Sequence, residues 1–299
     1  MRPPPVIPAI LAVCAGLVAI GWIGAPAWPA EAVAGAAPQI GLLLAAGAIA
    51  LAATRRWRAS LAALAIGAAS VLGVVRHPIP EAPPLTGPAD ATVVWANTFK
   101  SEASAARVFA YAGAIGADVV ALAEYRGRAE RADYPYARGA AGHDGSTITV
   151  FSRRPILDWR YHRGPGRDPV AFAIEVDAGR LLIACAHPTI PLTPGKTRDR
   201  AGQIARAFAL AEGAPHAIAI GDFNATPWNR ALARAAVAAG AERAPTGGPT
   251  WLSAAPLLGL PIDHAFAVRG VRISAARGPF TGSDHYPLAI RVALAADQP

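Results

Sequence analysis

Hydrophobic positions form long uninterrupted stretches in the first part of the chain and alternate with polar positions in the rest. Three apolar stretches, at 6–25, 37–54 and 59–75, each approach the ~20 residues that a helix needs to cross ~30 Å of hydrocarbon. From about residue 91, short apolar runs typical of strands alternate with longer runs of helical periodicity. The pattern predicts about three transmembrane helices followed by a mixed α/β domain.

The second region divides into short elements separated by polar turns. Strands are expected at 92–97, 119–123, 147–151, 170–176, 181–186 and 217–220, and helices near 102–115 and 197–212. A further helix is expected to begin with Thr226 as N-cap and Pro227 at its first position, and to end before Gly240. Residues 76–90 contain five prolines and predict an extended linker with neither helix nor ladder.

Charge follows the same division of the chain. Only five charged residues precede position 76, namely Arg2, Glu31, Arg55, Arg56 and Arg58. A hydrophobic content of 53% and a mean hydropathy of +0.31 exclude intrinsic disorder and a single globular core. We therefore expect a membrane region at 1–75, a linker at 76–90 and a folded domain at 91–299.

The positions of the arginines predict an orientation in the membrane. Arg2 and the cluster at 55–58 flank alternate ends of the apolar stretches, and the loop at 26–36 has no Lys or Arg. The positive-inside rule then predicts a multi-pass protein of a bacterial-type inner membrane, with the bilayer as partner and the α/β domain on the periplasmic or extracellular side. The net charge of +8 allows an anionic substrate but demands no nucleic acid, and nothing indicates an obligate protein partner.

Polar residues stand where several apolar runs end, which is where a rigid sheet can position catalytic groups. Asn97 ends one run. Glu124 follows another and is either a solvated strand end or a ligand for a hard metal ion. His187 closes a third run and is either a structural hydrogen-bonding residue or a site residue.

The segment Gly-Asp-Phe-Asn at 221–224 follows the strand predicted at 217–220. In extended chain Asp222 and Asn224 point the same way, so together they could orient a water and hold a phosphate oxygen. A local turn or a helix cap is the alternative interpretation of the same two side chains.

Two Asp-His pairs lie about twenty residues apart, at 263–264 and 284–285. Neighbouring residues on a strand point to opposite faces, so each side chain must find its partner elsewhere in the fold. Asp263 can orient His285 as a general base for water, and this leaves Asp284 to face a cation.

Taken in order and context, these residues resemble the endonuclease/exonuclease/phosphatase superfamily. That family includes pancreatic deoxyribonuclease, abasic-site endonucleases, neutral sphingomyelinases and inositol polyphosphate phosphatases. The resemblance covers about 91–297, and its most specific parts are 221–227 and 283–287. It implies a four-layer αββα sandwich whose site lies at one end of two mixed sheets.

The resemblance also implies a metal-dependent phosphoester hydrolase. Asn97, Glu124 and Asp284 would hold Mg²⁺ or Mn²⁺. His285, oriented by Asp263, would act on the attacking water together with Asp222, while Asn224 and His187 would stabilise developing charge. The chain departs from the family pattern in two ways: Ala123 stands where many members have Gln, and the domain is short.

Substrate identity stays open at this stage. A phosphodiester of nucleic acid is one possibility, and a lipid headgroup or inositol phosphate, as for a sphingomyelinase- or phosphoinositide-phosphatase-like enzyme, is another. A non-catalytic, membrane-tethered binding module is an alternative of a different class. The complete set of site carboxylates counts against it.

Overall fold

The computed structural model describes residues 6–23, 28–74, 78–128, 130–141, 147–161 and 167–295. By their contacts, the residues divide into two compact units. The helical unit consists chiefly of residues up to Pro78, and the sheet unit contains both β-sheets and begins at Ile79.

The helical unit contains α1 (Val6–Ile23), α2 (Trp28–Gly35), α3 (Ala37–Ala53) and α4 (Trp57–Val74). Helices α3 and α4 approach closely because small residues meet at their contact: a Cβ on Gly67 would lie 3.3 Å from the carbonyl oxygen of Gly41. The buried hydroxyls of Ser60 and Ser70 on α4 donate to main-chain carbonyls of α3 at 2.8 and 2.9 Å. Close packing and two buried hydrogen bonds therefore hold this helix pair together.

The three predicted apolar stretches do form helices, but they are short. Helices α1, α3 and α4 contain 18, 17 and 18 residues, and a rise of about 1.5 Å per residue makes each shorter than ~30 Å of hydrocarbon. Among the described residues no helix combines the length and apolarity needed to cross a membrane. The structure thus does not support the spans expected at 6–25, 37–54 and 59–75, and the location inferred from them stays a prediction.

Two mixed, six-stranded sheets make up the core of the sheet unit. The first has the order β11-β12-β1-β2-β4-β3 and the second β5-β6-β7-β8-β10-β9. The first sheet is built from β1 (Ala91–Asn97), β2 (Val119–Ala123), β3 (Tyr136–Ala141), β4 (Thr147–Ser152), β11 (Val271–Arg277) and β12 (Leu288–Leu294). The second is built from β5 (Leu157–Tyr161), β6 (Val170–Val176), β7 (Gly179–Ala186), β8 (Ala217–Asp222), β9 (Glu242–Arg243) and β10 (Asp263–Arg269).

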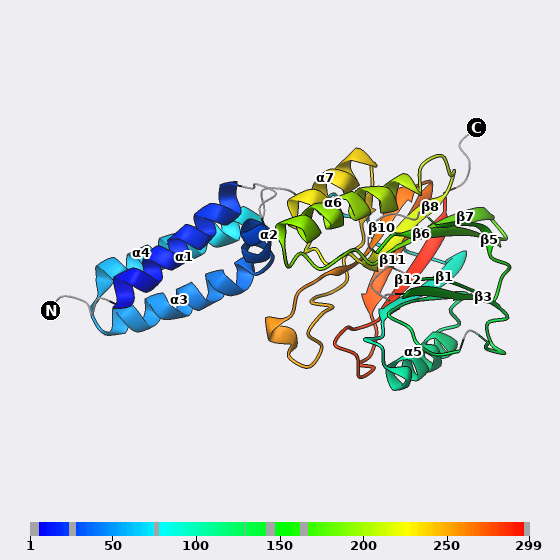
Figure 1. Ribbon diagram of the computed structural model, residues 1–299, viewed down its shortest axis with the longest axis horizontal. Helices are drawn as coiled ribbons and strands as arrows, with labels where there is room; N and C mark the ends of the chain where they lie inside the picture. The colour runs from blue at the N-terminus through cyan, green and yellow to red at the C-terminus, as the bar shows by residue number, and fades with distance from the viewer. Residues whose placement is uncertain are drawn as a thin grey trace. The chain divides into compact units, whose positions relative to one another are not determined.

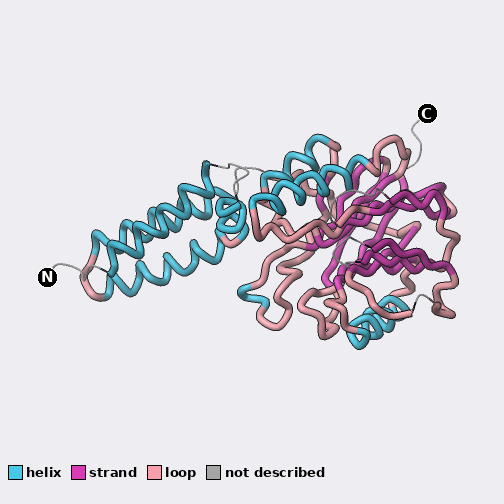
Figure 2. Tube along the Cα trace, viewed as in Figure 1, coloured by secondary structure: helices cyan, strands magenta, loops and turns pink. Residues whose placement is uncertain are grey.

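The sheets pack face to face and helices cover their outer faces (Figures 1 and 2). Trp95 and Val150 of the first sheet share a core with Phe172 and Ile183 of the second. Helix α5 (Glu102–Ala114) packs on the outside of the first sheet. Helices α6 (Pro194–Ala209) and α7 (Arg230–Ala238) pack on the outside of the second, so the αββα sandwich is confirmed.

Two local features of the sheet unit differ from the sequence-based expectation. The helix expected after Thr226 begins only at Arg230, because a turn follows Pro227. The Pro-rich segment does contain a backbone pairing, since the Ala82 N–H donates to the Arg243 carbonyl at 2.9 Å. Ile79 and Ala82 are buried in the cores of the sheet unit, because apolar side chains lie between the prolines.

Strand direction brings distant segments to one edge of the sandwich. The pairs β1–β2 and β7–β8 are parallel, so the carboxyl ends of each pair lie side by side. Strand β10 runs antiparallel to β8 and places Asp263 opposite Asp222. Strand β12 runs antiparallel to β1, so the loop that precedes β12 reaches the same edge.

Candidate active site

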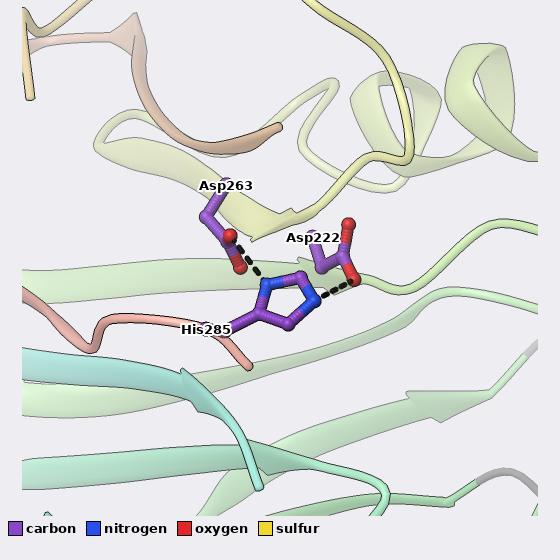
Figure 3. A group of neighbouring side chains, drawn as sticks. All are labelled: Asp222, Asp263 and His285. Carbon is purple, nitrogen blue, oxygen red and sulfur yellow. Dashed lines mark hydrogen bonds and ion pairs between the residues drawn. The ribbon is translucent and has the colours of Figure 1, made fainter. Parts of the chain in front are cut away.

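A buried His-Asp pair lies at this edge (Figure 3). The Nδ1–H of His285 donates to Oδ2 of Asp263 at 2.7 Å, and Oδ1 of Asp263 accepts from the indole N–H of Trp95 at 2.9 Å. Asp263 is fully buried. Because both carboxylate oxygens accept hydrogen bonds, Asp263 fixes the orientation of the imidazole and leaves Nε2 facing Asp222.

Asp222 lies at the end of β8, with Oδ2 3.6 Å from Nε2 of His285. Its Oδ2 also accepts from the Asn97 amide at 3.1 Å, and its Oδ1 accepts from the Asn224 N–H at 3.0 Å. Gly221, just before it, allows β7 and β8 to approach, since a Cβ there would overlap the carbonyl oxygen of Ala186. The position of the Asp222 carboxylate is therefore set by backbone packing and by hydrogen bonds on both oxygens.

Burial and the neighbouring carboxylates shift the pKa values of Asp222 and His285 and favour a proton on the His285 imidazole. Burial raises the pKa of Asp222. For His285, burial by itself lowers the pKa, but the carboxylates of Asp263, Asp222 and Asp284 outweigh it and raise the pKa to about 10. Near neutral pH the raised pKa of His285 thus favours a proton on Nε2, which faces the buried Asp222.

His187, after β7, links Asp222 to Glu124. Its Nε2 lies 3.7 Å from Oδ2 of Asp222 and 3.6 Å from Oε1 of Glu124. Nη1 of Arg167 lies 2.6 Å from the same Nε2. A guanidinium only donates, so in this arrangement His187 Nε2 accepts and the imidazole is neutral.

The carboxylate of Glu124 is aimed by an unusual backbone conformation. Glu124 has a φ of 55°, and Phe99, Lys100 and Asn224 at the same edge also have positive φ values, of 48°, 59° and 46°. Residues other than glycine rarely adopt this left-handed region, and such residues cluster at functional sites. Nζ of Lys100 lies 4.0 Å from Oε2 of Glu124, which places a cation beside the carboxylate.

Asp284 and Asn224 occupy the margin of the cluster. Oδ2 of Asp284 accepts from the indole N–H of Trp251 at 3.1 Å, and its neighbour Ser283 donates to the Asn97 carbonyl at 2.7 Å. The Asn224 amide donates to the Pro188 carbonyl at 2.9 Å, which ties the end of β8 to the loop that carries His187. Asn224 thus makes the local hydrogen bonds of a turn, and its role toward substrate stays a prediction.

Two groups of residues could hold a metal ion. Asp222, Asp263 and His285 have ligand atoms within 4.8 Å of one another, but both oxygens of Asp263 and Nδ1 of His285 are already hydrogen-bonded. The group predicted from sequence is Asn97, Glu124 and Asp284. Among the described residues, neither Glu124 nor Asp284 belongs to a cluster of three acidic, His or Cys ligand atoms within that distance. The carboxylate and amide oxygens of that second group suit a hard ion such as Mg²⁺ or Mn²⁺.

All eight residues predicted from the sequence lie at this edge, and contacts join seven of them directly, namely Asn97, Glu124, His187, Asp222, Asn224, Asp263 and His285. Sequence reasoning missed Trp95 and Arg167. Arg167 had a signal, because it stands just before the apolar run of β6. Trp95 had none, since its partner Asp263 is 168 residues away.

A family model described as the Endonuclease/Exonuclease/phosphatase family matches residues 94–285, more than half of the chain. The chain belongs to the endonuclease/exonuclease/phosphatase family. The resemblance predicted from the residues is thereby confirmed. Members of this family are metal-dependent phosphoester hydrolases.

Two solved structures with TM-scores above 0.5 support the fold. An endonuclease/exonuclease/phosphatase from Beutenbergia cavernae is 17% identical, with a TM-score of 0.58 over 69% of this chain and 72% of that one. One from Bacteroides vulgatus is also 17% identical, with a TM-score of 0.53 over 68% of this chain and 98% of that one. Staphylococcus aureus beta toxin, solved with bound magnesium ions, is 15% identical, with a TM-score of 0.49 over 68% and 99%. No curated protein matches the chain.

Proposed function

We propose that this protein is a divalent-metal-dependent phosphodiesterase in which Asp222 takes a proton from the attacking water and His285 donates one to a phosphoryl oxygen. The observation that carries the proposal is the geometry of three side chains: Asp263 holds Nδ1 of His285 at 2.7 Å, and Nε2 faces Asp222 at 3.6 Å. This separation is longer than a hydrogen bond, so a water or a phosphoryl oxygen can approach both groups.

The raised pKa of His285 assigns different tasks to the two groups. Asp222, with a pKa raised by burial, is the better proton acceptor and takes the proton of the water. His285, held protonated by its carboxylate neighbours, donates to a phosphoryl oxygen whose charge grows during attack. Asn97 and the Asn224 N–H, which donate to Asp222, keep its carboxylate oriented for this transfer.

Asn97, Glu124 and Asp284 would hold Mg²⁺ or Mn²⁺ through oxygen atoms. When bound, the ion supplies positive charge beside a phosphoryl oxygen. Arg167, whose Nη1 lies 2.6 Å from Nε2 of His187 and 4.0 Å from Oε1 of Glu124, is placed to neutralise the remaining charge of the phosphate, and His187 holds this guanidinium in position.

The substrate is a phosphodiester of nucleic acid or of a lipid headgroup. A phosphoinositide-phosphatase-like activity on a monoester is the second candidate within the same chemistry. A binding module without catalysis is disfavoured, because a site that only binds has no need of a buried His-Asp pair facing a second carboxylate.

The test is a hydrolysis assay of the full chain on DNA, RNA, phospholipids and inositol phosphates. Activity on at least one substrate should disappear in EDTA and return with Mg²⁺ or Mn²⁺. A His285→Ala variant, folded by circular dichroism, should stay inactive after the metal is restored. Absence of metal-dependent hydrolysis on every substrate would refute the proposal and favour the binding module.

A further inference from the structure

Two loops stand beside the candidate site and are tied to each other. One, residues 249–262, precedes β10, and the other, 278–287, precedes β12 (orange and red in Figure 1). The Ser253 N–H donates to the Asp284 carbonyl at 2.9 Å, and the hydroxyl of Tyr286 donates to the Ser253 carbonyl at 3.1 Å. With the Trp251–Asp284 bond, these contacts hold both loops in position relative to His285.

Large apolar side chains are exposed on these loops. Leu257 is 94% exposed, Leu258 64% and Phe280 58%. Phe99, 60% exposed, lies on a third loop, two residues after Asn97 of the site. We call these four residues the apolar rim. Because most large apolar residues of the sheet unit are buried, four exposed ones next to a catalytic cluster mark an interaction surface.

The charge of the rim loops distinguishes between partners. Residues 244–262 contain no charged side chain, and the charged side chains of the loop at 278–287 are Asp284 and His285 of the site. A nucleic acid would need Lys or Arg contacts to the phosphates that flank the scissile one. The two guanidiniums beside the loops, of Arg107 and Arg277, donate to the main-chain carbonyls of Thr281 and Pro249. Exposed leucines and phenylalanines instead suit insertion between lipid headgroups. Lys100, next to Phe99, adds a cation that attracts an anionic surface.

We propose that the apolar rim docks on a phospholipid surface, so that the site receives the phosphodiester of a lipid headgroup. This inference rests on the proposed function for the reaction and adds the substrate class. The rim residues enter the headgroup layer, and the rigid link from Trp251 to Asp284 keeps the catalytic cluster at a constant depth below it.

The test measures binding of the full chain to vesicles of phosphatidylcholine, alone or mixed in equal parts with phosphatidylglycerol. A Leu257→Ser, Leu258→Ser double variant should bind at least about tenfold more weakly, since two leucines no longer leave water. Val237→Ser is the matched control, because Val237 is 58% exposed on α7 and lies outside the rim. Its binding should equal that of the wild type.

A soluble phosphodiester, bis(p-nitrophenyl) phosphate, separates docking from chemistry. The double variant should hydrolyse it at the wild-type rate, because neither leucine is part of the catalytic cluster. Unchanged vesicle binding in the double variant would overturn the docking surface, as would a loss of DNA binding with vesicle binding intact. If neither the wild type nor the double variant hydrolyses any phosphoester, but the double variant still binds vesicles more weakly than the wild type, the proposed function fails and the docking surface stands.

Discussion

The helical unit and the sheet unit differ in where their large apolar side chains lie. In the sheet unit, the large apolar side chains lie between the sheets, and a few polar side chains, including Asp222 and Asp263, are buried with them. In the helical unit, Leu42, Leu43 and Ile49 of α3 are mostly exposed. Burying a carboxylate costs free energy that the fold must recover, so the two adjacent buried carboxylates of Asp222 and Asp263 indicate where the chemistry is.

The largest expected effect of this difference is on catalysis. Asp222→Asn and His285→Ala should each lower kcat by ~10²-fold or more, because each removes a group that transfers a proton during the reaction. Leu43→Ala in the helical unit should leave kcat unchanged. Steady-state kinetics with saturating Mg²⁺ measures all three variants, and equal losses in all of them would contradict the division between the units.

Two glycine-to-alanine substitutions, one in each unit, test how tightly the unit is packed around the glycine. Gly221→Ala should destabilise the protein by more than ~2 kcal/mol, because the new Cβ meets the Ala186 carbonyl between β7 and β8. Gly47→Ala on α3 meets nothing within 4 Å and should stabilise its helix by up to ~1 kcal/mol. Urea unfolding measures both changes. A neutral Gly221→Ala would show that the strands have room to separate.

Truncation tests how much the Pro-rich segment at 78–90 contributes to the stability of the sheet unit. A chain that begins at Pro78 should retain the unfolding free energy of the sheet unit. A chain that begins at Asp90 should lose on the order of a few kcal/mol, because it lacks the buried side chains of Ile79, Ala82 and Leu85. Thermal unfolding of the two chains makes the comparison, and equal midpoints would mean that the segment contributes nothing.

The pH dependence of stability should come from the sheet unit. Burial lowers the pKa of His264 to about 3, and its Nε2–H donates to the Ala225 carbonyl at 2.8 Å. Between pH 6.5 and 3 the unfolded chain binds a proton that the folded chain excludes, so stability falls as pH falls through this window. The loss is on the order of a few kcal/mol.

A His264→Gln variant tests this source of the pH dependence. Glutamine can still donate to Ala225 but does not titrate, so the difference in unfolding free energy between the two proteins should change from pH 7 to pH 3.5 in favour of the variant. If the unfolding free energies of the wild type and the variant changed equally between pH 7 and pH 3.5, His264 would be excluded as the cause.

The sequence by itself determined the elements and the motifs at their ends. Apolar periodicity is local, so the runs at 119–123 and 217–220 predicted strands correctly, and the residues after them predicted site groups. The same local signal was misleading in the helical unit. Apolarity shows that a stretch avoids water, whereas crossing a membrane also depends on where the helix begins and ends.

Only the tertiary structure decided which polar residues meet. The pairing of β8 with β10 places Asp263 opposite Asp222, and the packing of one sheet on the other brings Trp95 to Asp263. The same fold brings Arg167 to His187 and exposes Leu257 beside the site. These contacts depend on strand order and sheet packing, which join residues far apart in the chain, and no local pattern of apolar and polar positions encodes them.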